Sequence, residues 1–121
     1  GDKKPIAKKA YLQHLKECTN FFSGMSRKLF GREIPLILLL HANELNADCL
    51  PDILALYRSM GFHFISLNEA VADPAYQPYL LRPPLVKCHG DRNFLNQIAL
   101  SRGMEIPDIS GDAWFKENWT Q

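Results

Sequence analysis

Near the end of its first third the chain reads Ile34-Pro35-Leu36-Ile37-Leu38-Leu39-Leu40, a continuously apolar run that ends in the polar His41-Ala42-Asn43. A strand that is apolar on both faces is typical of a parallel sheet covered by helices. Pro35 is compatible with this interpretation because proline is tolerated at the first residues of a strand. The run therefore predicts a buried strand of a parallel sheet.

The residues after this run extend it into a strand–helix–strand unit. Residues 48–60 predict a helix, with Asn46 and Asp48 as candidate N-caps and Gly61 at its end. The following residues, 62–67, predict a second strand. Because the connections are short, the two strands are expected to be parallel, as in a βαβ unit.

Further helices are predicted on either side of this unit. Residues 6–30 carry a single apolar stripe at alternating steps of four and three: Tyr11, Leu15, Cys18, Phe22, Met25 and Leu29. Ser66 and Glu69 have the spacing of a capping box, which predicts a short helix over 67–72. Residues 93–101 predict one more short helix, and the rest of 80–121 is expected to be an irregular tail.

Composition and charge restrict the class of protein. The 121 residues are 46% hydrophobic and 22% charged, which is ordinary for a folded globular protein and argues against disorder as the main state. The net charge of +1 gives no basic face, so nucleic acid is not an expected partner. No apolar run approaches the roughly 20 residues that span a bilayer, and the first residues do not resemble a signal peptide.

His41 is the main candidate for chemistry. Ligands of parallel α/β sheets bind beyond the carboxyl ends of the strands, and a histidine there can act as acid or base near neutral pH. Asn43, Asn46 and Asp48 follow in the same loop, where turn and cap roles are the simpler interpretation. A plain structural role for His41 also remains open.

The remaining histidines and the cysteines give weaker signals. His14, His63 and His89 lie in separate predicted elements, and no two histidines have metal-ligand spacing. Three widely spaced cysteines, Cys18, Cys49 and Cys88, indicate free thiols, buried or half-buried, rather than a disulfide framework.

The stretch from Leu29 to Asn43 resembles the last conserved block of the polysaccharide deacetylases, the family with the NodB homology domain. The continuation is also similar to members described as xylanase/chitin deacetylase-like: Leu45-Asn46-Ala47-Asp48, then Gly61-Phe62-His63-Phe64-Ile65-Ser66-Leu67-Asn68-Glu69-Ala70 and Asp73-Pro74-Ala75-Tyr76. The resemblance covers about 10–79 and is specific over 29–76. It implies an α/β fold, the last βαβ units of a distorted (β/α)7 barrel, with 1–121 as a single unit from the C-terminal portion of such a domain.

The resemblance also implies a chemistry. Members remove acetyl groups from N- or O-acetylated sugars, with a divalent metal, commonly zinc, polarising the acetyl carbonyl and activating a water. In the family's Leu-x-His motif, matched by Leu39-Leu40-His41, the histidine is the general acid and Leu39 would line the pocket for the acetyl methyl group. The expected substrate is an acetylated polysaccharide or oligosaccharide, and the family makes an exported or periplasmic location in a bacterium the expectation.

The family's earlier motifs are missing from this sequence. They supply the catalytic aspartate and the metal ligands, one aspartate and two histidines, from an Asp-Asp block and a His-x-x-x-His block. We therefore expect this chain to bind no metal and to be inactive alone, with a missing N-terminal half or another copy of the chain as its partner. A non-catalytic interaction domain derived from the same barrel, and a partner-dependent domain without a site, are the alternatives.

Overall fold

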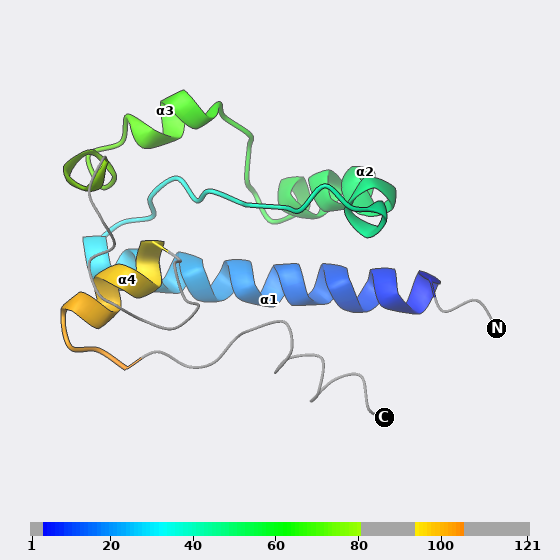
Figure 1. Cartoon of the computed structure of the whole chain (residues 1–121), viewed down its shortest axis with the longest axis horizontal. Helices are drawn as coiled ribbons and strands as arrows, with labels where there is room; N and C mark the ends of the chain where they lie inside the picture. The colour runs from blue at the N-terminus through cyan, green and yellow to red at the C-terminus, as the bar shows by residue number, and fades with distance from the viewer. Residues whose placement is uncertain (1–3, 81–93, 106–121) are drawn as a thin grey trace. The chain divides into compact units, whose positions relative to one another are not determined.

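A computed structural model describes residues 4–80 and 94–105. In these residues it is helical, with 66% of them in helices, and it contains no strand (Figure 1). The expectation of an α/β fold, with the last βαβ units of a (β/α)7 barrel, is therefore wrong for the described part of the chain. The helices themselves lie largely where the sequence predicts them.

The longest element is α1, which runs from Lys4 to Phe30 (Figure 1). At 1.5 Å per residue its 27 residues span about 40 Å. Arg27 and Lys28 occupy its last turn, where basic side chains interact favourably with the helix dipole. Gly31 follows with φ of 71°, a left-handed conformation that only glycine adopts readily, and its N–H bonds the carbonyl of Arg27. The predicted helix over 6–30 and its glycine stop are confirmed.

The chain divides into two compact units, both of which include part of α1. The described residues of the first unit are 4–20 and 37–65. Its buried core, which we call the Cys49 cluster, consists of Leu15, Cys49, Ile53 and Tyr57. In the second unit the described residues are 21–36, 66–80 and 94–105. Its core, the Ile98 cluster, consists of Met25, Leu29, Ile34, Ala75, Tyr76, Leu95, Ile98 and Ala99.

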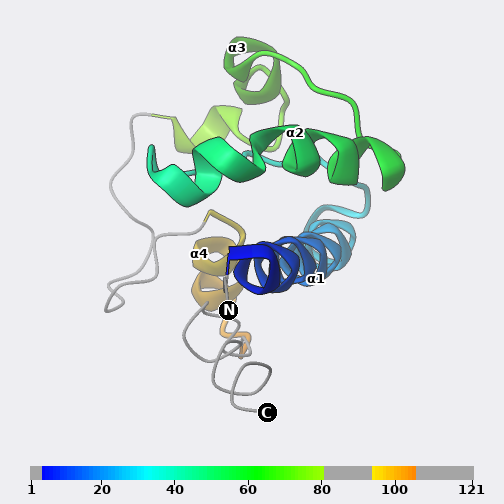
Figure 2. The same ribbon diagram turned by 90° about the vertical axis from the view of Figure 1, so that its right-hand side faces the viewer.

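The second helix, α2 (Glu44–Ser59), builds the rest of the first unit. It begins earlier than predicted, because Asn43 rather than Asn46 or Asp48 is the N-cap. The Asn43 side-chain oxygen accepts a hydrogen bond from the Asn46 N–H at 2.8 Å. Pro51 consequently lies inside the helix, not in its first turn. Figure 2 looks nearly along α1 and shows α2 as a separate helix.

The second unit adds three short helices, α3 (Leu67–Val71), the 3-10 helix η1 (Gln77–Tyr79) and α4 (Phe94–Ser101). The capping box predicted at the start of α3 is present, with Glu69 N–H donating to the Ser66 hydroxyl at 3.1 Å. The ring of Phe94 packs against Tyr76, with centroids 4.7 Å apart, and against Tyr79 at 5.4 Å. These contacts join α4 to the turn that contains η1.

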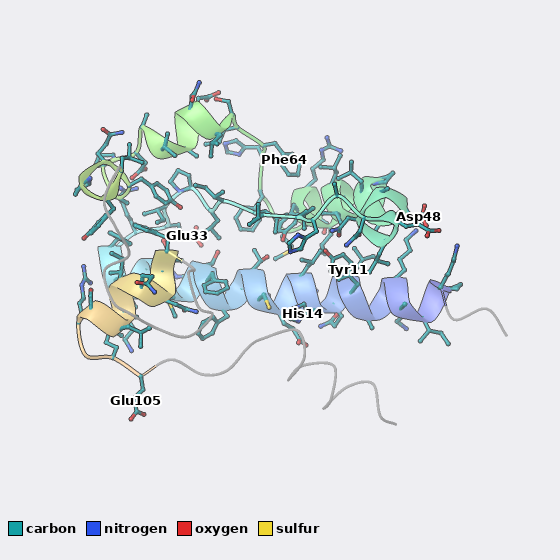
Figure 3. The ribbon with its side chains drawn as sticks, viewed as in Figure 1. Tyr11, His14, Glu33, Asp48, Phe64 and Glu105 are labelled. Carbon is teal, nitrogen blue, oxygen red and sulfur yellow. The ribbon has the colours of Figure 1, made fainter. Side chains whose placement is uncertain are left out.

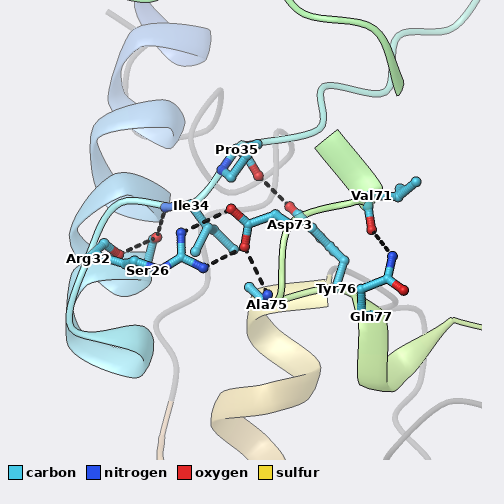
Figure 4. A network of polar contacts seen from close by, with 9 residues as sticks. All are labelled: Ser26, Arg32, Ile34, Pro35, Val71, Asp73, Ala75, Tyr76 and Gln77. Carbon is cyan, nitrogen blue, oxygen red and sulfur yellow. Dashed lines mark hydrogen bonds and ion pairs between the residues drawn. The ribbon is translucent and has the colours of Figure 1, made fainter. Parts of the chain in front are cut away.

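A polar network fixes the backbone after α1 (Figure 4). The Ser26 hydroxyl donates to the carbonyl of Arg32 at 3.0 Å and accepts from the N–H of Ile34 at 2.8 Å. Arg32 binds both carboxylate oxygens of Asp73, at 3.0 and 2.5 Å, and this pairing lowers the pKa of that carboxyl. The Tyr76 hydroxyl donates to the carbonyl of Pro35 at 2.6 Å. The start of the apolar run is thereby attached to the turn after α3.

The fold class is wrong because the two segments predicted as strands, 34–40 and 62–67, form no strand. Residues 32–40 and 62–66 are outside helices, but no hydrogen-bonded ladder joins them to any described segment, and Leu67 belongs to α3. Apolar, β-branched composition favours an extended backbone, whereas a strand also requires a neighbouring backbone to pair with. Three consecutive side chains are also exposed, Ile37 at 49%, Leu38 at 47% and Leu39 at 86%, so this run is not buried on both faces.

The Ser26 hydroxyl provides a test of this arrangement. Ser26→Ala would leave a buried N–H and a carbonyl without their partner, so we expect the free energy of unfolding to fall by about 1–3 kcal/mol. Ser59→Ala is the matched control, since Ser59 is exposed and its hydroxyl donates to the Leu56 carbonyl within the same helix, and it should change stability by no more than about 0.5 kcal/mol. Urea unfolding of both variants decides, and equal losses would contradict the buried role of Ser26.

Candidate functional site

Residues 34–40 lie outside helices and are drawn out along their length in Figure 1, and we call them the extended run. The candidate site is the turn that connects this run to α2, residues 41–46, which we call the His41 turn. The carbonyl of His41 accepts two hydrogen bonds, from the N–H of Asn43 at 3.0 Å and from the side-chain amide nitrogen of Asn46 at 2.7 Å. A carbonyl oxygen has two lone pairs, so both are engaged. The backbone of His41 is therefore fixed to the first turn of α2 on its C-terminal side.

Tyr11 of α1 completes this arrangement. Its hydroxyl donates to the side-chain oxygen of Asn46 at 2.5 Å, and Figure 3 shows Tyr11 on α1 in the region facing α2. Burial of the ring raises the pKa of the Tyr11 hydroxyl above its ordinary value, so the group keeps its proton at neutral pH and remains a donor. A chain of hydrogen bonds thus runs from α1 through Asn46 to the backbone of His41.

The side chains of the two predicted site residues are both exposed. His41 is exposed and, among the described residues, its imidazole makes no hydrogen bond that would occupy it. Leu39 lies two residues earlier with 86% of its surface exposed, which makes it the most exposed large apolar side chain of the described part. Leu40, between them, packs against the Cys49 cluster. The structure therefore presents Leu39 and His41 to solvent on either side of a residue anchored in the core.

The polar residues that follow His41 have different roles. Asn43 and Asn46 are brought together with the His41 backbone, as N-cap and as carbonyl anchor. Asp48 is exposed on α2 and does not join them (Figure 3). The interpretation of the loop as turn and cap chemistry is thus confirmed for the two asparagines, although the cap is Asn43.

The other histidines and cysteines are not gathered at this turn. His14 and Cys18 lie one turn apart on α1, with the sulfur 3.6 Å from each ring nitrogen, and burial lowers the pKa of His14 and raises that of Cys18. Cys49 is fully buried in its cluster, and His63 is exposed. The prediction of free, buried or half-buried thiols is confirmed for Cys18 and Cys49. Cys88 and His89 lie outside the described residues.

Residues 4–80 and 94–105 contain neither a metal-binding group nor a helix suited to a membrane. Within these ranges no group of three or more His, Cys, Asp or Glu side chains could hold a metal ion. None of the helices there combines the length and the apolar character that crossing a membrane requires. No described residue set therefore fits a zinc ion, which needs at least three converging protein ligands.

The sequence did not identify Asn46 and Tyr11 as partners of His41. Asn46 carries a signal, because an asparagine soon after a strand-like run is a candidate for capping or turn bonds, but its bond to the preceding carbonyl depends on where α2 begins. Tyr11 belongs to the apolar stripe of α1, and its hydroxyl partner lies 35 residues further along the chain. Such a pairing arises only from tertiary packing.

Comparisons with protein-family models, with curated proteins and with solved structures found no match to this chain.

Because the side chains of Leu39 and His41 are exposed, we expect them to contribute little to the free energy of unfolding. His41→Ala and Leu39→Ala should each change the free energy of unfolding by less than about 0.5 kcal/mol, because neither side chain is buried. Ile53→Ala serves as the contrast, since Ile53 is 1% exposed and its truncation should cost about 2–5 kcal/mol. Thermal and urea unfolding of the three variants measure this. A loss above about 1 kcal/mol for His41→Ala would place its ring in packing contacts instead.

Proposed function

We propose that this chain is the C-terminal part of a polysaccharide deacetylase-like hydrolase and that His41 is its general acid. The observation that carries the proposal is an exposed imidazole whose backbone is held by two hydrogen bonds at the end of an apolar extended segment. A general acid must be accessible to the leaving group and held in a defined direction. The exposed side chain and the bonded backbone of His41 support this role.

The reaction would be hydrolysis of an acetyl group on an N- or O-acetylated polysaccharide or oligosaccharide. The resemblance assigns the polarisation of the acetyl carbonyl to a divalent metal, zinc or another, for which the described residues of this chain supply no ligand set. His41 would donate a proton to the departing amine or alcohol, a role for which histidine is suited because it titrates near neutral pH. Leu39, exposed two residues earlier, would supply apolar surface for the acetyl methyl group.

The catalytic base and the metal ligands would come from a polypeptide that carries the family's other motifs, or from another part of the same protein. The exposed apolar side chains of the first unit's extended segments support a partner of this kind. They are Ile37, Leu38, Leu39, Phe64 and Ile65, each more than 40% exposed. Exposed apolar groups concentrated in two short segments are typical of surfaces that associate with another chain.

The same side chains favour a second candidate function, a non-catalytic interaction domain. In that case the apolar segments would bind a partner and the His41 turn would have no catalytic role. Loss of activity on changing His41 separates the two proposals, since an interaction domain would lose nothing on removal of one exposed imidazole.

Removal of the imidazole tests the catalytic proposal in the complete enzyme. His41→Ala should lower kcat for an acetylated sugar oligomer by about 10²- to 10⁴-fold, the usual contribution of a general acid, with little change in stability. His63→Ala is the matched control, because His63 is also an exposed histidine of the first unit outside any helix. Acetate release measured for both variants decides, and activity equal to that of the parent in His41→Ala would exclude the role.

A second prediction concerns metal binding by this chain alone. The ligand set of one aspartate and two histidines belongs to motifs that the sequence does not contain, and zinc affinity depends on ligand number and geometry. We expect no stoichiometric zinc binding in calorimetric titration and no acetate release from acetylated chitin oligomers. A tight one-to-one zinc complex, or turnover by this chain alone, would contradict its assignment as an incomplete site.

A further inference from the structure

Asn46 makes three hydrogen bonds, and together they connect α1, the start of α2 and the backbone of His41 within the first unit. Its backbone N–H donates to the Asn43 side chain at 2.8 Å, its side-chain oxygen accepts from Tyr11 at 2.5 Å, and its side-chain nitrogen donates to the carbonyl of His41 at 2.7 Å. We propose that Asn46, oriented by Tyr11, is the positioning residue that fixes the direction in which the His41 side chain projects from the backbone. This inference rests on the proposed function of His41.

The orientation of the Asn46 amide follows from the chemistry of its neighbours. The His41 carbonyl can only accept, so the group facing it must be the NH₂ of Asn46. The amide oxygen is then turned toward Tyr11, whose hydroxyl must be the donor. The donors and acceptors of Tyr11, Asn46 and His41 therefore match in only this orientation of the amide. A reversed amide would place its oxygen against the His41 carbonyl oxygen.

The bond from Asn46 to the His41 carbonyl acts on the backbone, and through the backbone it affects the exposed His41 side chain. The His41 imidazole is exposed, so the protein can direct it only through the backbone, which sets the direction of the Cα–Cβ bond about which the ring turns. On the N-terminal side Leu40 is held by packing against the Cys49 cluster, and on the C-terminal side the carbonyl is held by Asn43 and Asn46. The bond from the Asn43 N–H joins residues only two positions apart in the chain. The bond from Asn46 instead connects the His41 carbonyl oxygen to α1, because Asn46 also bonds Tyr11. Removing the Asn46 side chain therefore removes the bond that connects the His41 carbonyl, through Tyr11, to α1.

A nearly isosteric substitution tests the inference. Asn46→Asp replaces the NH₂ group by an oxygen, so at neutral pH it repels the His41 carbonyl while its other oxygen can still accept from Tyr11. Tyr11→Phe removes the opposite end of the hydrogen-bond chain and keeps the ring. Ser66→Ala is the control, because it removes the helix cap of α3, at a cost of about 1 kcal/mol, and touches no residue of the His41 turn.

The first readout is the order of the His41 turn in this chain, measured by NMR relaxation of the His41 ring and of the backbone at Ala42. We expect lower order for both groups in Asn46→Asp, a smaller loss in Tyr11→Phe, and parent-like order in Ser66→Ala even though that variant is less stable. If the order of the His41 turn followed overall stability alone, the destabilised control would also show lower order. Unchanged order at His41 in Asn46→Asp would overturn the inference.

The second readout is the kinetics of the complete enzyme. Asn46→Asp should lower kcat by about 10- to 100-fold with little effect on KM, since misplacement of a reacting group by about 1 Å can cost 10²-fold. Added to His41→Ala, it should cost almost nothing more. If His41→Ala lowers kcat and Asn46→Asp does not, the positioning role fails and the general acid stands. If His41→Ala leaves kcat unchanged, the proposed function fails, and the NMR result alone decides whether Asn46 orders the turn.

Discussion

The apolar stripe of α1 is the constraint on which both units depend. One helix supplies Leu15 to the Cys49 cluster and, about three and four turns later, Met25 and Leu29 to the Ile98 cluster. A helix in a folded protein gains most of its stability from tertiary packing of its apolar face, so each cluster stabilises the part of α1 that it covers. In the first unit the partner is α2, and in the second it is α4 with the turn around Tyr76. A polar substitution on the stripe would therefore affect a core as well as the helix.

The consequence for the candidate site lies in how the extended run is attached. Its start is fixed in the second unit, where Ile34 is bonded to Ser26 and Pro35 to Tyr76. Its end is fixed in the first unit, where Leu40 packs into the Cys49 cluster and His41 bonds Asn46. Between these anchors, Ile37, Leu38 and Leu39 are exposed. The run thus presents apolar surface along its middle and an imidazole at its end, a combination that both the catalytic and the interaction proposals use.

Local signals in the sequence were sufficient for the helices and insufficient for the sheet. The stripe of α1, its glycine stop at Gly31 and the capping box at Ser66 each depend on residues within a few positions of one another, and all three are confirmed. The predicted strands depended on a pairing between distant segments, which apolar composition does not encode. His41 could be selected from its place at the end of the apolar run. Its contacts with Asn46 and Tyr11 could not, because they follow from the tertiary contact between α1 and α2.

The central claim is that the described chain is built on helices, with residues 37–40 and 62–65 extended but not paired with each other. NMR of the labelled chain tests this most directly, through Cα secondary shifts and through cross-strand NOEs. The account predicts helical shifts over 4–30, 44–59 and 94–101, and no regular pattern of NOEs between 37–40 and 62–65. A continuous set of cross-strand NOEs between those two segments, with strand-like shifts in both, would contradict it.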